Sequence, residues 1–295
     1  MKTTQMLQWV AKRLPCGRSR FIKVVAKYSG SRTLRCCPIW LKLAPNVMFV
    51  GDLREVVFHP LFLYGCYPHQ LAEETISRGI LRPGDIVYDI GANIGYTAVL
   101  YADAVQKSGH VYAFEPSCKC LYFLQENVKL WDNITVLPKA VSDALGEATF
   151  VERKKVDTSS IASEEKGTKP ITSKDLIYTV KMTTLDHFYK ASGGTHPPQF
   201  IKVDVEGNEV KVFHGAAELI RSAEPIIMFE ALSVERVESN VKVLADISKG
   251  KYRFARVTHK GELVIPDSTN PNVTNNFFAI PRWAKERFSL VQAQM

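Results

Sequence analysis

The stretch 84-GDIVYDIGANIGYTAVLYADAVQKSGHVYAFEP-116 predicts a strand, a glycine-containing turn, a helix and a second strand. The first strand, 86–88, is β-branched and aromatic and follows the breaker pair Pro83-Gly84. Apolar residues recur at helical spacing over 96–105, and 110–114 forms the second strand. Such a βαβ unit places a glycine turn beneath a helix N-terminus and an acidic residue at the tip of the next strand. That geometry suits a nucleoside.

The spacing of the glycines distinguishes between nucleotide ligands. A dinucleotide fingerprint that starts at Gly91 would need glycines where the chain has Asn93 and Tyr96. Asp89, two residues before Gly91, would repel a pyrophosphate but can accept hydrogen bonds or face an ammonium or sulfonium group. Glu115, 24 residues after Gly91, is placed to accept both hydroxyls of a ribose. These residues favour an adenosine with a cationic tail over NAD, and an ordinary strand–helix turn is the alternative.

Seven stretches, in the same order, resemble the FkbM-type family of S-adenosylmethionine-dependent methyltransferases. They are VYDIGANIGYTAVLYA (87–102), VYAFEPS (111–117), AVSDALGEATF (140–150), TSSI (158–161), TTLDHF (183–188), FIKVDVEGNEVKVFHGA (200–216) and PIIMFE (225–230), and the match covers roughly residues 60 to 281. The resemblance implies a Rossmann-like class I methyltransferase fold. It also implies O-methylation, often of a sugar or polyketide hydroxyl.

The fold class that follows is α/β, with a mostly parallel seven-stranded sheet and helices on both faces. The resemblance implies the strand order 3-2-1-4-5-7-6, with strand 7 antiparallel. It also places adenine contacts around 140–143, at the end of a third strand. The predicted S-adenosylmethionine site therefore consists of Asp89, Gly91, Asn93, Gly95, Tyr96, Glu115, Pro116, Ala140, Ser142 and Asp143.

Acidic residues stand at the ends of two later strands. Ligands in open α/β sheets bind beyond the carboxyl ends of the strands. Asp204 and Glu206, at the end of strand 200–205, are therefore expected to face the same crevice as the nucleoside unit. Glu230, at the tip of strand 225–230, joins them.

Methyl transfer from a sulfonium needs positioning and a base. The methyl group is already activated, so the acceptor oxygen must be held in line and must lose its proton to a carboxylate or histidine. Asp204 is the first candidate for this base, and Lys202, on the same strand face, keeps it ionised or orients it. Glu206 and His69 are further candidates. The alternative for Asp204 is to cap the helix that follows.

A bound metal is not expected. The three strand-tip acids could hold Mg²⁺ or Ca²⁺, but no Asp-Asn pair follows the strand 225–230. The six cysteines contain no C-x-x-C pair, which disfavours a zinc site. Reduced thiols in a cytosol are the simplest reading of these cysteines.

The positive charge of the chain is concentrated at its start. The 295 residues carry a formal net charge of +8, yet residues 1–50 hold 10 Lys/Arg and no Asp/Glu, which leaves the remainder close to neutral. Residues 1–28 predict two basic amphipathic helices. They either lie on an anionic membrane or pack on the domain, while a basic arm offers nucleic acid only non-specific attraction. No stretch of about 18 apolar residues predicts a membrane span, and no signal peptide is apparent.

The predicted organisation has three parts: a basic extension (1–59), a methyltransferase domain (60–285) and a C-terminal tail (286–295). Less regular patterns predict one or two strands over 46–64, helices over 67–80 and 209–221, a strand over 134–141 and a polar loop over 157–175 that covers the site.

The predicted activity is methyl transfer from S-adenosylmethionine to a hydroxyl oxygen of a small molecule or saccharide. N-methylation of a small molecule or protein is one alternative, and a non-catalytic scaffold with a membrane or partner arm is another. We expect a cytoplasmic protein without a specific nucleic-acid partner. Peripheral contact with the inner membrane surface through residues 1–28 is left open.

Overall fold

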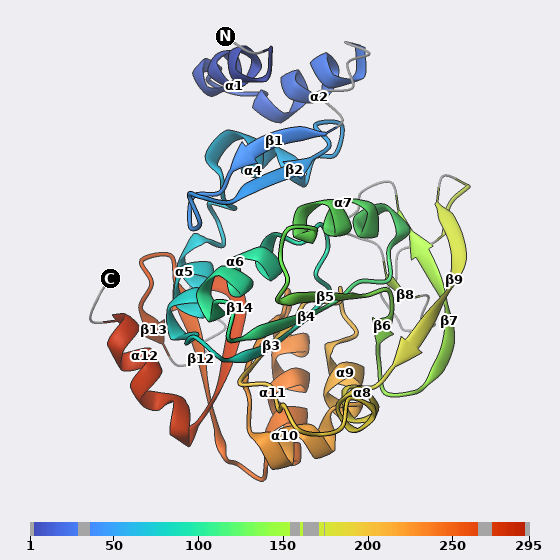
Figure 1. Ribbon diagram of the computed structural model, residues 1–295, viewed down its shortest axis with the longest axis vertical. Helices are drawn as coiled ribbons and strands as arrows, with labels where there is room; N and C mark the ends of the chain where they lie inside the picture. The colour runs from blue at the N-terminus through green and yellow to red at the C-terminus, as the bar shows by residue number, and fades with distance from the viewer. Residues whose placement is uncertain are drawn as a thin grey trace.

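The computed structural model describes residues 3–28, 36–153, 160–161, 171–173, 175–264 and 273–292. Its centre is a sheet with the strand order β13-β12-β14-β11-β10-β3-β4-β5 (Figure 1). These strands are β3 (Ile86–Ile90), β4 (His110–Phe114), β5 (Ile134–Leu137), β10 (Phe200–Val203), β11 (Ile226–Glu230), β12 (Tyr252–Thr258), β13 (Leu263–Val264) and β14 (Val273–Pro281).

The strand order confirms the expected Rossmann-like topology. Read from β5 to β12, the sheet follows the order 3-2-1-4-5-7-6, and β14 runs antiparallel to β11. The sheet has eight strands in the described residues instead of seven, because the two-residue strand β13 pairs with the edge of β12. The prediction of seven strands is corrected in this respect.

Helices cover both faces of the sheet (Figure 1). One face packs against α5 (Leu71–Ile80), α6 (Tyr96–Val105) and α7 (Cys118–Val128), and the other against α8 (Leu185–Ala191), α9 (Glu209–His214), α10 (Ala217–Ala223) and α11 (Val234–Ser248). Side chains alternate between the two cores: Val87 and Phe200 belong to the first, and Tyr88 and Ile201 to the second. Burial on both faces explains why these strands are almost wholly apolar.

The predicted third strand divides in two. β5 ends at Leu137, and β6 (Ala140–Val141) belongs to a second sheet with the order β6-β9-β7-β8. Pro138 lies between them, and a proline cannot donate to a continuing ladder. The remaining strands of this second sheet are β7 (Gly146–Glu152), β8 (Ser160–Ile161) and β9 (Leu176–Thr183). Most of the predicted loop 157–175 lies outside the described residues.

The predicted helix 209–221 is likewise two helices, α9 and α10, which are separated at Gly215. A Cβ on Gly215 would lie 2.0 Å from the carbonyl oxygen of Ser142. The close approach of these two backbones requires glycine, which is a poor helix former.

The N-terminal segment forms a separate layer above the α5–α7 side of the sheet (Figure 1). It consists of α1 (Thr3–Arg13), α2 (Arg18–Tyr28), β1 (Cys37–Trp40), β2 (Met48–Gly51) and α4 (Phe58–Tyr64). The two helices predicted within residues 1–28 are confirmed, and Leu7 and Ile22 are among their buried residues. In the described residues, no helix is long and apolar enough to cross a membrane.

Two predictions in this segment are wrong in part. Of the stretch 46–64, only β2 is a strand, and residues 58–64 form the helix α4, which buries Phe58, Leu61 and Phe62. The following helix, α5, begins at Leu71 instead of residue 67. At the other end of the chain, α12 (Lys285–Gln292) packs against α5 and contains the described part of the predicted tail.

Candidate active site

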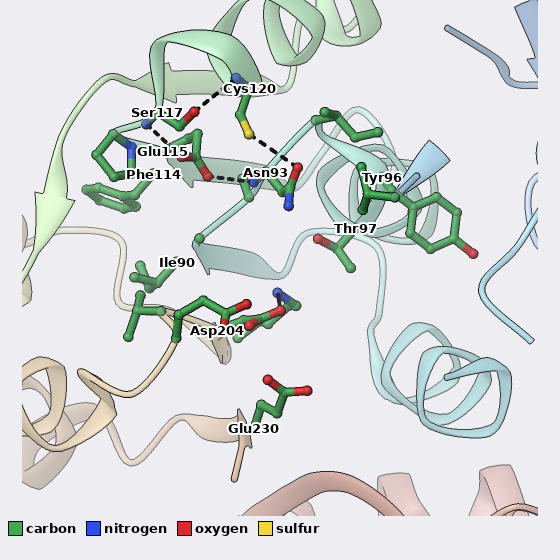
Figure 2. A pocket seen from close by; sticks show the side chains of 18 of the residues that line it. Ile90, Asn93, Tyr96, Thr97, Phe114, Glu115, Ser117, Cys120, Asp204 and Glu230 are labelled. Atoms are coloured by element: carbon green, nitrogen blue, oxygen red, sulfur yellow. Dashed lines mark hydrogen bonds and ion pairs between the residues drawn. The ribbon is translucent and has the colours of Figure 1, made fainter. Parts of the chain in front are cut away.

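A cavity of about 620 Å³ opens at the carboxyl ends of β3, β4, β10 and β11. Figure 2 shows Asn93, Glu115 and Ser117 on one side of this space and Asp204 and Glu230 on the other. The volume lies within the range of small-molecule and cofactor sites. The two predicted halves of the site lie far apart in the chain, and the strand order brings them together.

The turn after β3 is shaped by residues in the left-handed region. Gly91 has φ +78° and Asn93 has φ 51°, conformations that glycine and asparagine adopt at least cost. A Cβ on Gly91 would lie 1.9 Å from the carbonyl oxygen of Asp204. Gly91 and Asn93 both line the cavity. The backbone of this turn is therefore accessible to a ligand.

Glu115 is buried at the end of β4 and lines the same cavity. Its Oε2 accepts a hydrogen bond from the Asn93 amide at 2.8 Å, and its Oε1 accepts one from the Ser117 amide at 2.7 Å. Burial raises the pKa of Glu115 to about 7, although these two amides oppose the shift. Each carboxylate oxygen keeps a further lone pair for a ligand hydroxyl. The residues present thus fit the ribose of an adenosine cofactor.

Asp89 does not reach the cavity surface. Its side chain is fully buried, accepts a hydrogen bond from Thr97 Oγ1 at 2.7 Å and lies 3.8 Å from Lys202 Nζ. Burial raises its pKa, and the Lys202 cation opposes this shift. Asp89 therefore accepts a hydrogen bond, which is one of the two roles expected for it, and direct contact with a sulfonium group stays a prediction.

Gly95 and Tyr96 begin α6. Gly95 has φ +90°, and a Cβ there would meet Leu124 of α7 at 2.8 Å, so Gly95 allows the two helices to approach. The Tyr96 ring lines the cavity, packs at 5.2 Å against the ring of Tyr67, and its hydroxyl donates to buried Glu74 at 2.7 Å.

The expected adenine contacts are brought to the cavity only in part. Pro116 and Ala140 line it, and Phe150 adds an aromatic wall that the sequence did not indicate. Ser142 and Asp143 are not among the residues that line it. The Ser142 hydroxyl donates to Asp143 Oδ1 at 3.1 Å, and the Ser142 backbone packs against Gly215.

Lys202 and Asp204 form an ion pair on the strand face that the alternation predicts. Lys202 Nζ donates to Asp204 Oδ2 at 3.0 Å. Burial disfavours the charged form of Lys202, but the carboxylates of Asp204 and Asp89 outweigh it and raise the pKa of the lysine. Helix α9 begins at Glu209, whose carboxylate accepts from the Gly207 amide. The carboxylate of Asp204 is thus engaged by Lys202 rather than by the start of that helix.

Glu206 and Glu230 complete an acidic group around Asp204. One carboxylate oxygen from each of the three residues lies within 4.8 Å of the others, a spacing that could hold a metal ion. Burial, together with the negative charge of Asp204, raises the pKa of Glu230 to about 7. Glu230 thus lies close to Asp204 and lines the cavity, in addition to standing at the tip of its strand.

His69 lies at the rim of the cavity, in the turn before α5. Its ring packs edge-on against Tyr67 at 6.0 Å. Partial burial lowers the pKa of His69, and electrostatic repulsion between its ring and His259 lowers it further.

Sequence reasoning missed one wall of the cavity, which comes from the N-terminal side of the βαβ unit. Besides His69, this wall contains Val56, Val57, Pro60, Tyr67 and Gln70. The tyrosine and histidine within residues 67–69 were the only sequence signal for this wall.

Comparisons with known proteins agree with this geometry. A family model described as "Methyltransferase FkbM domain" matches residues 89–254. The hexuronic acid methyltransferase AglP of Haloferax volcanii is 25% identical over 258 residues, which cover 84% of this chain and 92% of that protein.

Two solved structures are also similar. The methyltransferase FkbM of Methylobacillus flagellatus has a TM-score of 0.49 and 15% identity, over 94% of this chain and 57% of that chain. An S-adenosylmethionine-dependent O-methyltransferase of Thermotoga maritima has a TM-score of 0.42 and 12% identity, over 84% of this chain and 86% of that one. Because the family model matches more than half of the sequence, this chain belongs to the FkbM family and is an S-adenosylmethionine-dependent methyltransferase.

Proposed function

We propose that this methyltransferase transfers the methyl group to a hydroxyl oxygen of a saccharide. The observation that carries the proposal is a single cavity with a buried carboxylate for a ribose at one end and the Lys202–Asp204 ion pair at the other. A carboxylate beside the acceptor favours a hydroxyl, which must lose a proton, over an amine that attacks without one. The name of AglP, a hexuronic acid methyltransferase, supports a saccharide acceptor.

One group of residues would bind the cofactor, and another would act on the acceptor. When bound, S-adenosylmethionine supplies a methyl group that its sulfonium already activates. Glu115 would hold the ribose, and the bare turn at Gly91 would lie against the rest of the cofactor. Asp204 would accept the proton of the acceptor hydroxyl, while Lys202 donates to Asp204 Oδ2 and holds the carboxylate in place. Glu206 and His69 remain further candidates for this proton.

The acceptor would lie toward the N-terminal wall of the cavity. Tyr67 and His69 present aromatic rings there, beside the apolar Val57 and Pro60. A wall of rings and apolar groups suits the C–H face of a sugar.

A product screen with labelled cofactor tests the proposal. Oligosaccharides with and without hexuronic acid are incubated with the protein and S-[methyl-³H]adenosylmethionine, and the products are analysed by mass spectrometry. A gain of one methyl group on a saccharide oxygen is the expected result. Methylation confined to amines of small molecules or proteins would move the proposal to N-methylation, and cofactor binding without any product would favour a scaffold.

Glu115→Ala is expected to weaken S-adenosylmethionine binding by about 1.5–3 kcal/mol, because the ribose would lose hydrogen bonds to a charged group. Isothermal titration calorimetry measures the effect, with NAD as the negative control ligand. Glu115→Ala leaves the Asn93 and Ser117 amides without their acceptor, so a lower melting temperature is also expected. Equal affinity of variant and parent would remove Glu115 from the cofactor site.

We also propose that the N-terminal layer contacts an anionic membrane peripherally. Trp9 on α1 is 51% exposed and Trp40 on β1 is 63% exposed, and Trp40 pairs across the ladder with the exposed Met48. The same layer exposes basic side chains, namely Lys12, Arg13, Arg20, Lys23 and Lys27. Exposed tryptophans beside lysines and arginines are typical of interfacial helices.

The full-length protein is expected to sediment with vesicles that contain phosphatidylglycerol and to be released by salt, because screening weakens the attraction of exposed charges. Trp9→Ala should lower this binding. Trp283→Ala removes an exposed tryptophan from the C-terminal region and serves as the matched control. Salt-insensitive binding to neutral vesicles, or equal loss in both variants, would contradict the proposal.

A further inference from the structure

The second sheet reaches the cofactor end of the cavity through one buried carboxylate. Glu152 is the last residue of β7 and is almost completely buried. Its Oε2 accepts a hydrogen bond from the hydroxyl of Tyr178, on the neighbouring strand β9, at 3.0 Å. Its Oε1 accepts a hydrogen bond from the hydroxyl of Ser117, outside this sheet. Glu152 thus joins the second sheet to the segment that follows β4.

Ser117 is the residue through which this contact continues to Glu115. Its hydroxyl donates to Glu152 and accepts from the Cys120 amide at 3.2 Å, so it caps α7. Its own amide donates to Glu115 Oε1 at 2.7 Å. Because the hydroxyl is held by Glu152, the amide of the same residue is held in the direction of Glu115.

Tyr178 reinforces the same segment. Its hydroxyl donates to Glu152 and accepts a hydrogen bond from the Cys118 amide at 2.9 Å. Two successive residues after Pro116 are therefore fixed by side chains of β7 and β9. Both strands belong to a sheet that also contributes Phe150 to the cavity wall.

We infer that Glu152 is a positioning residue for the cofactor: through Ser117 it holds the Glu115 carboxylate in its binding orientation and thereby couples the second sheet to the cofactor site. This inference rests on the proposed role of Glu115. Burial of a carboxylate is costly, and an apolar residue of similar volume often stabilises a fold as well or better. The hydrogen bonds from Ser117 and Tyr178 satisfy the buried carboxylate of Glu152 and at the same time connect it to the segment that holds Glu115.

The coupling must be reciprocal, because a linkage between two sites acts in both directions. A ligand that engages Glu115 should therefore slow hydrogen exchange of the β7 and β9 amides in the parent protein. The same ligand should leave these amides unchanged in Glu152→Ala. A residue that only stabilised the fold would change exchange in the free protein but not its response to the ligand.

A double-mutant cycle tests the inference by calorimetry with S-adenosylhomocysteine. Glu152→Ala is expected to weaken binding about 10-fold, the equivalent of one lost hydrogen bond to a charged group. In the Glu115→Ala background it should have an effect of less than roughly twofold, because residues that act through one group are not additive. Glu147→Ala, an exposed glutamate on the same strand, is the matched control and should bind as the parent does.

Two further variants keep the inference testable if Glu152→Ala fails to fold. Glu152→Gln keeps an oxygen that can accept from Ser117 and should bind within about threefold of the parent. Tyr178→Phe removes only a hydroxyl and should weaken binding by a smaller factor than Glu152→Ala. If Glu152→Ala does not fold, Tyr178→Phe replaces it in the cycle with Glu115→Ala, and Glu152→Gln is the conservative control.

The outcomes separate this inference from the proposed cofactor site. If Glu115→Ala weakens binding while Glu152→Ala and Tyr178→Phe match the Glu147→Ala control, the inference is overturned and the cofactor site stands. Additive effects of Glu152→Ala and Glu115→Ala also overturn it. If Glu115→Ala binds as tightly as the parent, the ribose assignment fails and the inference fails with it.

Discussion

Asp204→Asn is expected to lower the rate of methyl transfer by roughly 10²–10⁴-fold, the usual worth of general-base catalysis. Asparagine keeps the shape of the side chain but cannot take the acceptor proton. The Lys202 ammonium would still find an oxygen at this position, so the melting temperature should change little. The affinity for S-adenosylmethionine should also remain close to that of the parent. The measurement is turnover with a saccharide acceptor identified by the product screen.

Two controls make the result specific. Asp246→Asn changes an exposed aspartate on α11 and should leave turnover unchanged. Both Asp204→Asn and the parent are also assayed with and without EDTA, because Asp204, Glu206 and Glu230 lie close enough to hold a cation. Loss of parental activity in EDTA and its return with a divalent ion would make Asp204 a metal ligand instead. Near-parental turnover of the variant in both conditions would direct attention to Glu206 and His69.

Gly91→Ala is expected to cause the largest loss of stability among single substitutions in the site. The new Cβ would lie 1.9 Å from the backbone carbonyl oxygen of Asp204, which cannot move without shifting the end of β10. The left-handed backbone at φ +78° adds its own penalty. Together these terms amount to about 2–5 kcal/mol. Chemical denaturation should show the loss, and cofactor binding should disappear even where the protein remains folded.

Gly194→Ala is the matched control for this prediction. Gly194 also has a left-handed backbone, at φ +63°, but a Cβ there would meet the Tyr189 ring only at an ordinary 3.9 Å. Its cost should therefore be limited to the backbone term, about 1–2 kcal/mol. Equal costs for the two substitutions would show that the contact between Gly91 and Asp204 is not a constraint.

The βαβ unit could be predicted from the sequence, because apolar strands and helical spacing are strong local signals. The order of the main strands came from the resemblance to the FkbM-type family and not from these signals. The helix α4 could not be predicted, since the run 56–64 is apolar almost throughout and gives no period. Asp89 was likewise not predicted to contact Lys202. It is the register partner of Lys202 on the adjacent strand, and that pairing arises from the order of strands that are far apart in the chain.

The properties of the acceptor side were even harder to predict from the sequence, because they arise from contacts between segments that are far apart in the chain. Glu230 acquires its raised pKa from burial and from Asp204, which is 26 positions away in sequence but on the neighbouring strand. The link from Glu152 through Ser117 to Glu115 joins two sheets, and no spacing in the sequence reveals it.

The N-terminal wall of the cavity has a consequence for protein engineering. Its residues, from Val56 to Gln70, all precede the segment 89–254 that the family model matches, whereas Glu115, Lys202 and Asp204 lie within it. A combinatorial library confined to Val56, Val57, Pro60, His69 and Gln70 would therefore vary the proposed acceptor wall while Glu115, Lys202 and Asp204 stay unchanged. The buried residues of α4 and Tyr67, which packs against Tyr96, would be kept.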